Sequence, residues 1–146
     1  MDSWEKYEYW LDISEYDLET AEANYKSGRY LYVVFMCQQA IEKIVKGLYI
    51  LYLNKEADRT HNIVRIFNTI FDEPTNRELI QDAEFDKIKE ANTEFFAELI
   101  YFYISERYPT YKQKLSSFID QEKAKEVLDK SKGVFEWLKS LSQYKI

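Results

Sequence analysis

The segment that decides the fold is RYLYVVFMCQQAIEKIVKGLYILYLN, residues 29–54. Its first part, RYLYVVF at residues 29–35, is aromatic and β-branched, and by itself it would suit a strand. The following QQAIEKIVKGLYILYL, residues 38–53, keeps a helical spacing for too long to form a strand. The segment therefore predicts one long helix from about Arg29 to Asn54.

This helix is apolar around most of its circumference. At 100° per residue, its polar side chains fall into one sector, and nearly every other position is apolar. A helix of this kind is the central element of a bundle. The residues of the polar sector are Gln38, Gln39, Glu42, Lys43 and Lys46.

The chain before residue 29 predicts a long amphipathic helix. Its apolar stripe recurs in alternating steps of three and four residues, and Gly28 suits the left-handed position after a helix end. The residues of this stripe are Trp4, Tyr7, Leu11, Ser14, Leu18, Ala21 and Tyr25.

The stretch after the central helix predicts a short helix over residues 60–71, THNIVRIFNTIF. We expect Thr60 to be its N-cap and His61 to lie in its first turn, with a structural role. The sequence DEPTN at residues 72–76 interrupts the chain, and the helical state of residues 76–84 stays undecided.

Two further long helices follow. One runs from about Phe85 to near Arg107, because Pro109 disfavours the α conformation at Tyr108. The last is capped by Asp120. Its stripe is Ala124, Val127, Ser131, Val134, Leu138 and Leu141.

The whole pattern predicts an all-α fold, a compact antiparallel bundle of four to five helices. The chain of 146 residues has only three Gly and two Pro, so it has few places to turn. By length, residues 1–146 form a single domain. We expect its core to contain Val34, Ile41, Val45, Leu48, Phe95 and Leu99.

Charge and cysteine content limit the classes of function. The net charge of −6 argues against broad, sequence-independent nucleic-acid binding. The single Cys37 favours an intracellular, cytoplasmic protein, and the apolar run GLYILYL at residues 47–53 is far too short to span a membrane. With one His and one Cys, we expect no metal site and no cofactor.

Four stretches in this order resemble the HEPN domain family: YDLETAEANYKSGRY, VVFMCQQAIEKIVKGLYI, THNIVRIF and SERYP. The resemblance implies a dimerising helical bundle that often works beside a minimal nucleotidyltransferase, with some members acting as ribonuclease toxins. Those ribonucleases carry an Arg followed four to six residues later by a His. Arg107 matches the Arg, but YPTYKQ follows it without a His. The resemblance thus leaves enzymatic activity uncertain, and we assign no catalytic residue.

The first candidate site is the basic segment from Arg107 to Ile119, which carries three positive charges and no acid. Arg107 lies on one helical face with Phe96, Ile100 and Tyr103. It could hold a phosphate bidentately, with Tyr108 beside it and Lys112 and Lys114 as looser charges. The alternatives are an Arg that complements the helix dipole and a solvated loop.

The second candidate site is the polar sector of the central helix, with Gln39, Glu42, Lys43 and Lys46. Glu42 and Lys46 are spaced i, i+4, so an ordinary surface ion pair is the alternative. If this sector lines a groove that meets the Arg107 end, Lys46 and Arg107 could face one anion.

The function expected from these features is that of a dimeric module that binds an anion, a nucleotide or RNA. Its partner would be a minimal nucleotidyltransferase in a toxin–antitoxin-type pair. Thirteen Tyr favour a homodimer, because Tyr suits partner interfaces. The alternative is a metal-independent ribonuclease with a non-standard site. In that case His61 would be the easiest acid–base group.

Overall fold

The computed structural model describes residues 1–108, 111 and 114–146. In these residues the chain forms six α-helices, two short 3₁₀ helices and no strand, which confirms the predicted all-α bundle. The elements are α1 (Ser3–Lys26), α2 (Tyr30–Leu53), α3 (Ile63–Phe71), α4 (Pro74–Leu79), α5 (Phe85–Arg107), η1 (Leu115–Ser117), α6 (Gln121–Ser140) and η2 (Leu141–Lys145).

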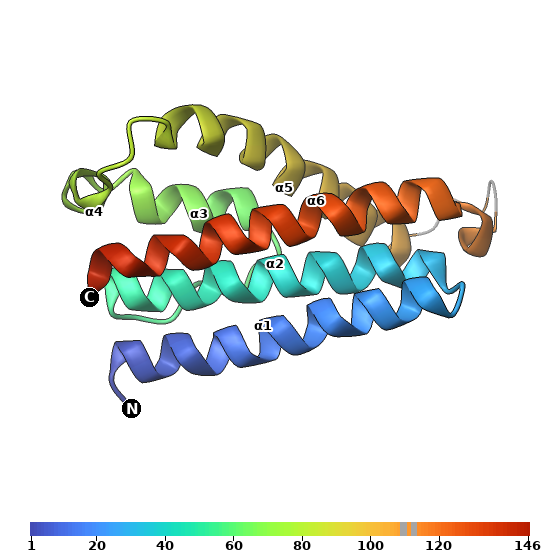
Figure 1. Ribbon diagram of the computed structural model, residues 1–146, viewed down its shortest axis with the longest axis horizontal. Helices are drawn as coiled ribbons and strands as arrows, with labels where there is room; N and C mark the ends of the chain where they lie inside the picture. Colours follow the sequence, from blue (N-terminus) through green and yellow to red (C-terminus); the bar gives the residue numbers. More distant parts are fainter. Residues whose placement is uncertain (109–110, 112–113) are drawn as a thin grey trace.

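Helix α2 is the central element, as its apolar circumference predicted. It contacts α1, α3, α5 and α6. Figure 1 shows α1, α2 and α6 lying side by side along the long axis, with α3 and α5 on the far side of α2 from α1. The short α4 lies at one end of the bundle.

The ends of the long helices follow local rules. Gly28 has φ 76°, the left-handed conformation expected after α1, and Asn54 ends α2 with φ 55°. The Asp120 carboxylate accepts a hydrogen bond from the Lys123 amide at 2.8 Å, so it caps α6 as predicted. Helix α5 ends at Arg107, also as predicted.

The predicted start of α3 is wrong by two to three residues. The cap is Asn62, whose side chain accepts from the Arg65 amide at 3.1 Å. Thr60 instead accepts from the Asn62 amide at 3.1 Å, which forms a tight turn before the helix. His61 therefore lies in the loop that leads into α3 and not in its first turn.

The undecided residues 76–84 are partly helical. Pro74 begins the short helix α4, because its fixed φ suits a first helical position. The buried Asn76 donates from Nδ2 to the Ile70 carbonyl at 3.0 Å, which ties α4 to the end of α3.

One hydrophobic core runs through the bundle, and all six predicted core residues are buried in it. Within the core, Phe67 makes ring contacts with Phe71, Phe96 and Trp137. Helices α1 and α2 approach closely at Gly47. A Cβ atom on Gly47 would lie only 2.9 Å from Trp10 Cβ.

Candidate functional site

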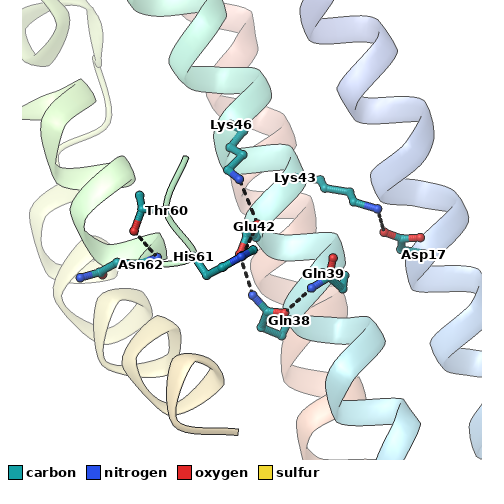
Figure 2. Close-up of polar contacts among 9 residues, drawn as sticks. All are labelled: Asp17, Gln38, Gln39, Glu42, Lys43, Lys46, Thr60, His61 and Asn62. Carbon is teal, nitrogen blue, oxygen red and sulfur yellow. Dashed lines mark hydrogen bonds and ion pairs between the residues drawn. The ribbon is translucent and has the colours of Figure 1, made fainter. Parts of the chain in front are cut away.

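Glu42 is the centre of a polar cluster on α2. It is only 4% exposed, and the Lys46 side chain is 17% exposed, so the alternative of an ordinary surface ion pair is wrong in its location. The Lys46 ammonium lies 3.1 Å from Glu42 Oε2, and Gln38 Nε2 donates to Glu42 Oε1 at 2.8 Å (Figure 2). These three residues meet because i, i+4 spacing puts them on one helical face.

The fourth member of the cluster comes from the loop before α3. His61 Nδ1 lies 2.9 Å from Glu42 Oε1 and 3.1 Å from Oε2. Because the Glu42 carboxylate accepts hydrogen bonds, this contact makes His61 Nδ1 the donor. The other ring nitrogen, Nε2, accepts a hydrogen bond when the ring is neutral and donates one when the ring is charged. The His61 side chain is 50% exposed, so a buried carboxylate orients an accessible imidazole.

Tyr103 connects this cluster to the end of α5. Its ring centroid lies 4.4 Å from that of His61. The Arg107 guanidinium, one turn further along α5, lies over the Tyr103 ring at 5.0 Å from its centroid. Arg107 is exposed and shares a helical face with Tyr103, as predicted. The contacts thus join six residues, which we call the Glu42–Arg107 cluster: Gln38, Glu42, Lys46, His61, Tyr103 and Arg107.

The predicted polar sector of α2 is divided between two roles. Lys43 points away from Glu42 toward α1, where its ammonium lies 2.7 Å from Asp17 Oδ2 (Figure 2). Gln39 Nε2 donates to Gln38 Oε1 at 2.7 Å, so Gln39 touches the cluster only through its neighbour. Lys43 therefore joins two helices, and the members of the polar sector that belong to the cluster are Gln38, Glu42 and Lys46.

The basic segment after α5 is described only in part. Tyr108, the residue after α5, is exposed, and Lys114 is an exposed residue just before η1. Lys112 and Pro109 lie outside the described residues. Of the segment's three cations, Arg107 is the one that the described contacts bring to the cluster.

The chemistry available in the cluster is that of anion binding and proton transfer. Arg107 offers a planar fork of donors and Lys46 a point charge, both suited to phosphate. His61 carries an imidazole, the kind of side chain that most often transfers protons near neutral pH. Across the described ranges, no group of three or more His, Cys, Asp or Glu side chains is arranged to hold a metal ion.

The sequence did not predict that Gln38 and His61 contact Glu42 or that His61 contacts Tyr103. Glu42 and His61 are 19 residues apart, and no periodicity relates two segments joined by a loop. The signal present was the sequence THN, in which a Thr-His pair precedes a helix.

None of the helices in the described part of the chain is long and apolar enough to cross a bilayer.

Two solved structures share this fold. The archaeal HEPN homologue ST0689 is 23% identical, with a TM-score of 0.67, and the match covers 94% of this chain and 98% of that one. The protein TT1696 from Thermus thermophilus is 22% identical, with a TM-score of 0.69, and the match covers 93% of this chain and 98% of that one. No curated protein matches the sequence. The model of the HEPN domain matches residues 7–141, and the chain therefore belongs to the HEPN domain family.

Proposed function

We propose that this HEPN domain protein is a dimeric module that binds a phosphate-bearing ligand at the Glu42–Arg107 cluster. We further propose that it serves a minimal nucleotidyltransferase in a toxin–antitoxin-type pair. The observation that carries the proposal is the exposed Arg107 guanidinium over Tyr103, whose ring in turn contacts His61. A cation fixed beside aromatic rings at a helix end suits nucleotide or RNA phosphates.

The dimer is supported by exposed apolar side chains at the end of α5. Tyr101 and Ile104 share one helical face of α5, Tyr108 follows directly after the helix, and all three side chains are exposed. Aromatic residues of this kind are enriched at protein interfaces. Sedimentation at micromolar concentration should therefore give twice the mass of the 17.7 kDa chain. A particle of the single chain's mass would contradict the dimer.

Ligand binding can be tested by titrating the protein into a labelled single-stranded RNA oligonucleotide and following fluorescence polarisation. Replacement of Arg107 by Ala should weaken binding by about tenfold or more, because a charge-assisted contact is lost. Arg107→Lys should recover only part of this, since Lys lacks the planar fork. The matched control is Arg65→Ala, an exposed Arg on α3, which should bind as the wild type does. Unchanged binding in Arg107→Ala would refute the site.

The nucleotidyltransferase partner is testable separately. If a minimal nucleotidyltransferase is encoded beside this protein, the two chains should co-purify after co-expression. Absence of such a neighbour, or failure of the pair to co-purify, would remove the partner from the proposal and leave the ligand site unaffected.

One observation favours a second candidate function, a metal-independent ribonuclease. The Glu42 carboxylate orients the half-exposed His61, so a proton carrier lies near Arg107 although the usual His after Arg107 is missing. If the protein is a binding module, we expect no robust RNA cleavage from it. RNA cleavage in the presence of EDTA that is lost in both His61→Gln and Arg107→Ala would establish the ribonuclease instead.

A further inference from the structure

A groove lies between α1 and α6, and none of its lining residues belongs to the Glu42–Arg107 cluster. Both helices pack against α2 and run in opposite directions, so α1 begins at the end of the bundle where α6 ends (Figure 1). The groove has a volume of about 360 Å³, within the range of small-molecule sites. Its lining includes the buried Phe135 and the half-buried Leu18, which offer a hydrocarbon floor to a ligand.

Two ion pairs cross the groove. The Lys139 ammonium lies 3.2 Å from Glu15 Oε1, and Lys132 pairs with Glu22. The pKa of Lys139 is raised, chiefly because its ammonium hydrogen-bonds to Glu15. Glu15 and Glu22 lie two turns apart on α1, a separation of about 10 Å along the helix axis. The pairs therefore leave an open stretch of groove between them.

Two further carboxylates lie along this open stretch. Glu19 comes from α1 and Glu136 from α6, and both side chains are exposed. Within residues 1–108, 111 and 114–146, neither makes a hydrogen bond or an ion pair. The lining thus sets four carboxylates against two ammonium groups, and both ammonium groups are already paired. The excess negative charge falls on Glu19 and Glu136, one on each wall.

This lining selects among classes of cation. Among the described residues, no three carboxylates converge closely enough to hold a metal ion, so a compact cation would meet at most part of the charge. A cation that carries several charges along a hydrocarbon chain fits better, because such chains lie along apolar surface while their charged groups stay in water. We propose that the groove binds a linear aliphatic polyamine, with ammonium groups at Glu19 and Glu136 and methylene groups over the apolar floor.

The inference goes beyond the proposed function and does not depend on it. Exposed carboxylates are screened by salt, so each contact with an ammonium group is weak by itself. Affinity must then come from the charges and the hydrocarbon chain acting together. A compound that has only one of these two features should bind less well, which makes the two contributions separable by experiment.

The test is isothermal titration calorimetry of the full chain, free of RNA, at about 0.15 M salt. The ligands are spermidine and 1,4-diaminobutane, with butylamine and magnesium chloride for comparison. Spermidine should bind saturably and at least about tenfold more tightly than butylamine, which has one charge, or Mg²⁺, which has no hydrocarbon chain. Equally tight binding of Mg²⁺ or butylamine, or no saturable binding of spermidine at millimolar concentration, would overturn the inference.

Variants assign the site. The double variant Glu19→Gln with Glu136→Gln keeps the size of both exposed side chains, and it should weaken spermidine binding by about tenfold or more. The matched control is Glu5→Gln with Asp12→Asn, which removes two exposed carboxylates of α1 that do not line the groove. The control should leave the affinity nearly unchanged. An equal loss in both double variants would show attraction by overall charge alone, and it would refute the site, as would unchanged binding in the groove variant.

This proposal and the proposed function fail in different ways. Arg107→Ala should leave spermidine binding unchanged, because the groove and the Glu42–Arg107 cluster share no residue. Loss of spermidine binding in Arg107→Ala, with retention in the groove variant, would overturn the assignment to the groove. Spermidine binding that depends on Glu19 and Glu136 would support it even if the protein bound no RNA.

Discussion

The close approach of α1 and α2 predicts opposite effects for two chemically identical substitutions. Gly47 and Gly133 both lie inside helices, α2 and α6. In an unobstructed helix, Gly→Ala stabilises the folded state by about 0.5–1 kcal/mol, because Gly loses more backbone entropy on folding. Both variants should receive this contribution.

The surroundings decide the sign. A Cβ atom at Gly133 would meet nothing within 4 Å, so Gly133→Ala should raise the free energy of unfolding by about 0.5–1 kcal/mol. At Gly47 the new methyl group would lie 2.9 Å from Trp10 Cβ and 3.3 Å from Tyr7 Cδ1. Those atoms lie on or near the backbone of α1, so α1 itself must move. Overpacking of this kind costs about 1–3 kcal/mol.

The net expectation for Gly47→Ala is a loss of up to about 2 kcal/mol, the difference between overpacking and the helix-propensity gain. Urea unfolding followed by circular dichroism measures both variants against the wild type. Gly133→Ala controls for the intrinsic effect of the methyl group. If Gly47→Ala proved as stabilising as Gly133→Ala, the two helices could not approach as closely as the structure has them.

Three further predictions concern the core. Leu48→Ala should lower the free energy of unfolding by roughly 2–5 kcal/mol because Leu48 is fully buried, and a loss below about 0.5 kcal/mol in urea unfolding would contradict that burial. Burial raises the pKa of the Cys37 thiol from 9.0 to about 12, so the neutral thiol stabilises the fold below pH 9. This stabilisation should fall between pH 9 and 12 by up to about 1.4 kcal/mol per pH unit, because the thiol ionises in the unfolded chain before it does in the folded protein. The free energy of unfolding should therefore decrease less steeply with rising pH in Cys37→Ala than in the wild type, and equal slopes would refute this. Tyr52→Phe removes a 2.7 Å hydrogen bond to the buried Leu141 carbonyl and should destabilise by about 1–3 kcal/mol, whereas the exposed Tyr9→Phe should have no effect on the same urea curve.

The type and the ends of a helix could be predicted from the sequence where a single local rule determined them. The apolar period of α2 outweighed the strand-like start of the segment, and Pro109 placed the end of α5 at Arg107. The start of α3 could not be placed, because Thr60 and Asn62 are both good N-cap residues. The choice between them depends on which side chain reaches the Arg65 amide, and spacing carries no information on that.

The contacts of the candidate site also fall into those that the sequence predicts and those that it does not. The Glu42–Lys46 and Tyr103–Arg107 pairs follow from i, i+4 spacing on single helices. The contact of His61 with Glu42 depends on the path of the loop after α2, and its contact with Tyr103 depends on how α5 docks. No periodic pattern in the sequence predicts the path of this loop or the docking of α5.

The burial of Glu42 is better explained by the site than by the fold. A buried carboxylate loses its hydration, and replacing a buried ion pair by apolar residues is often neutral or stabilising. Helix α2 is apolar at nearly all of its other buried positions, so an apolar residue at position 42 would extend the core. The carboxylate instead accepts from three donors, on Gln38, Lys46 and His61, and so holds them in one arrangement. The orientation of the half-exposed imidazole beside Tyr103 depends on that arrangement, which makes Glu42 a positioning residue for His61.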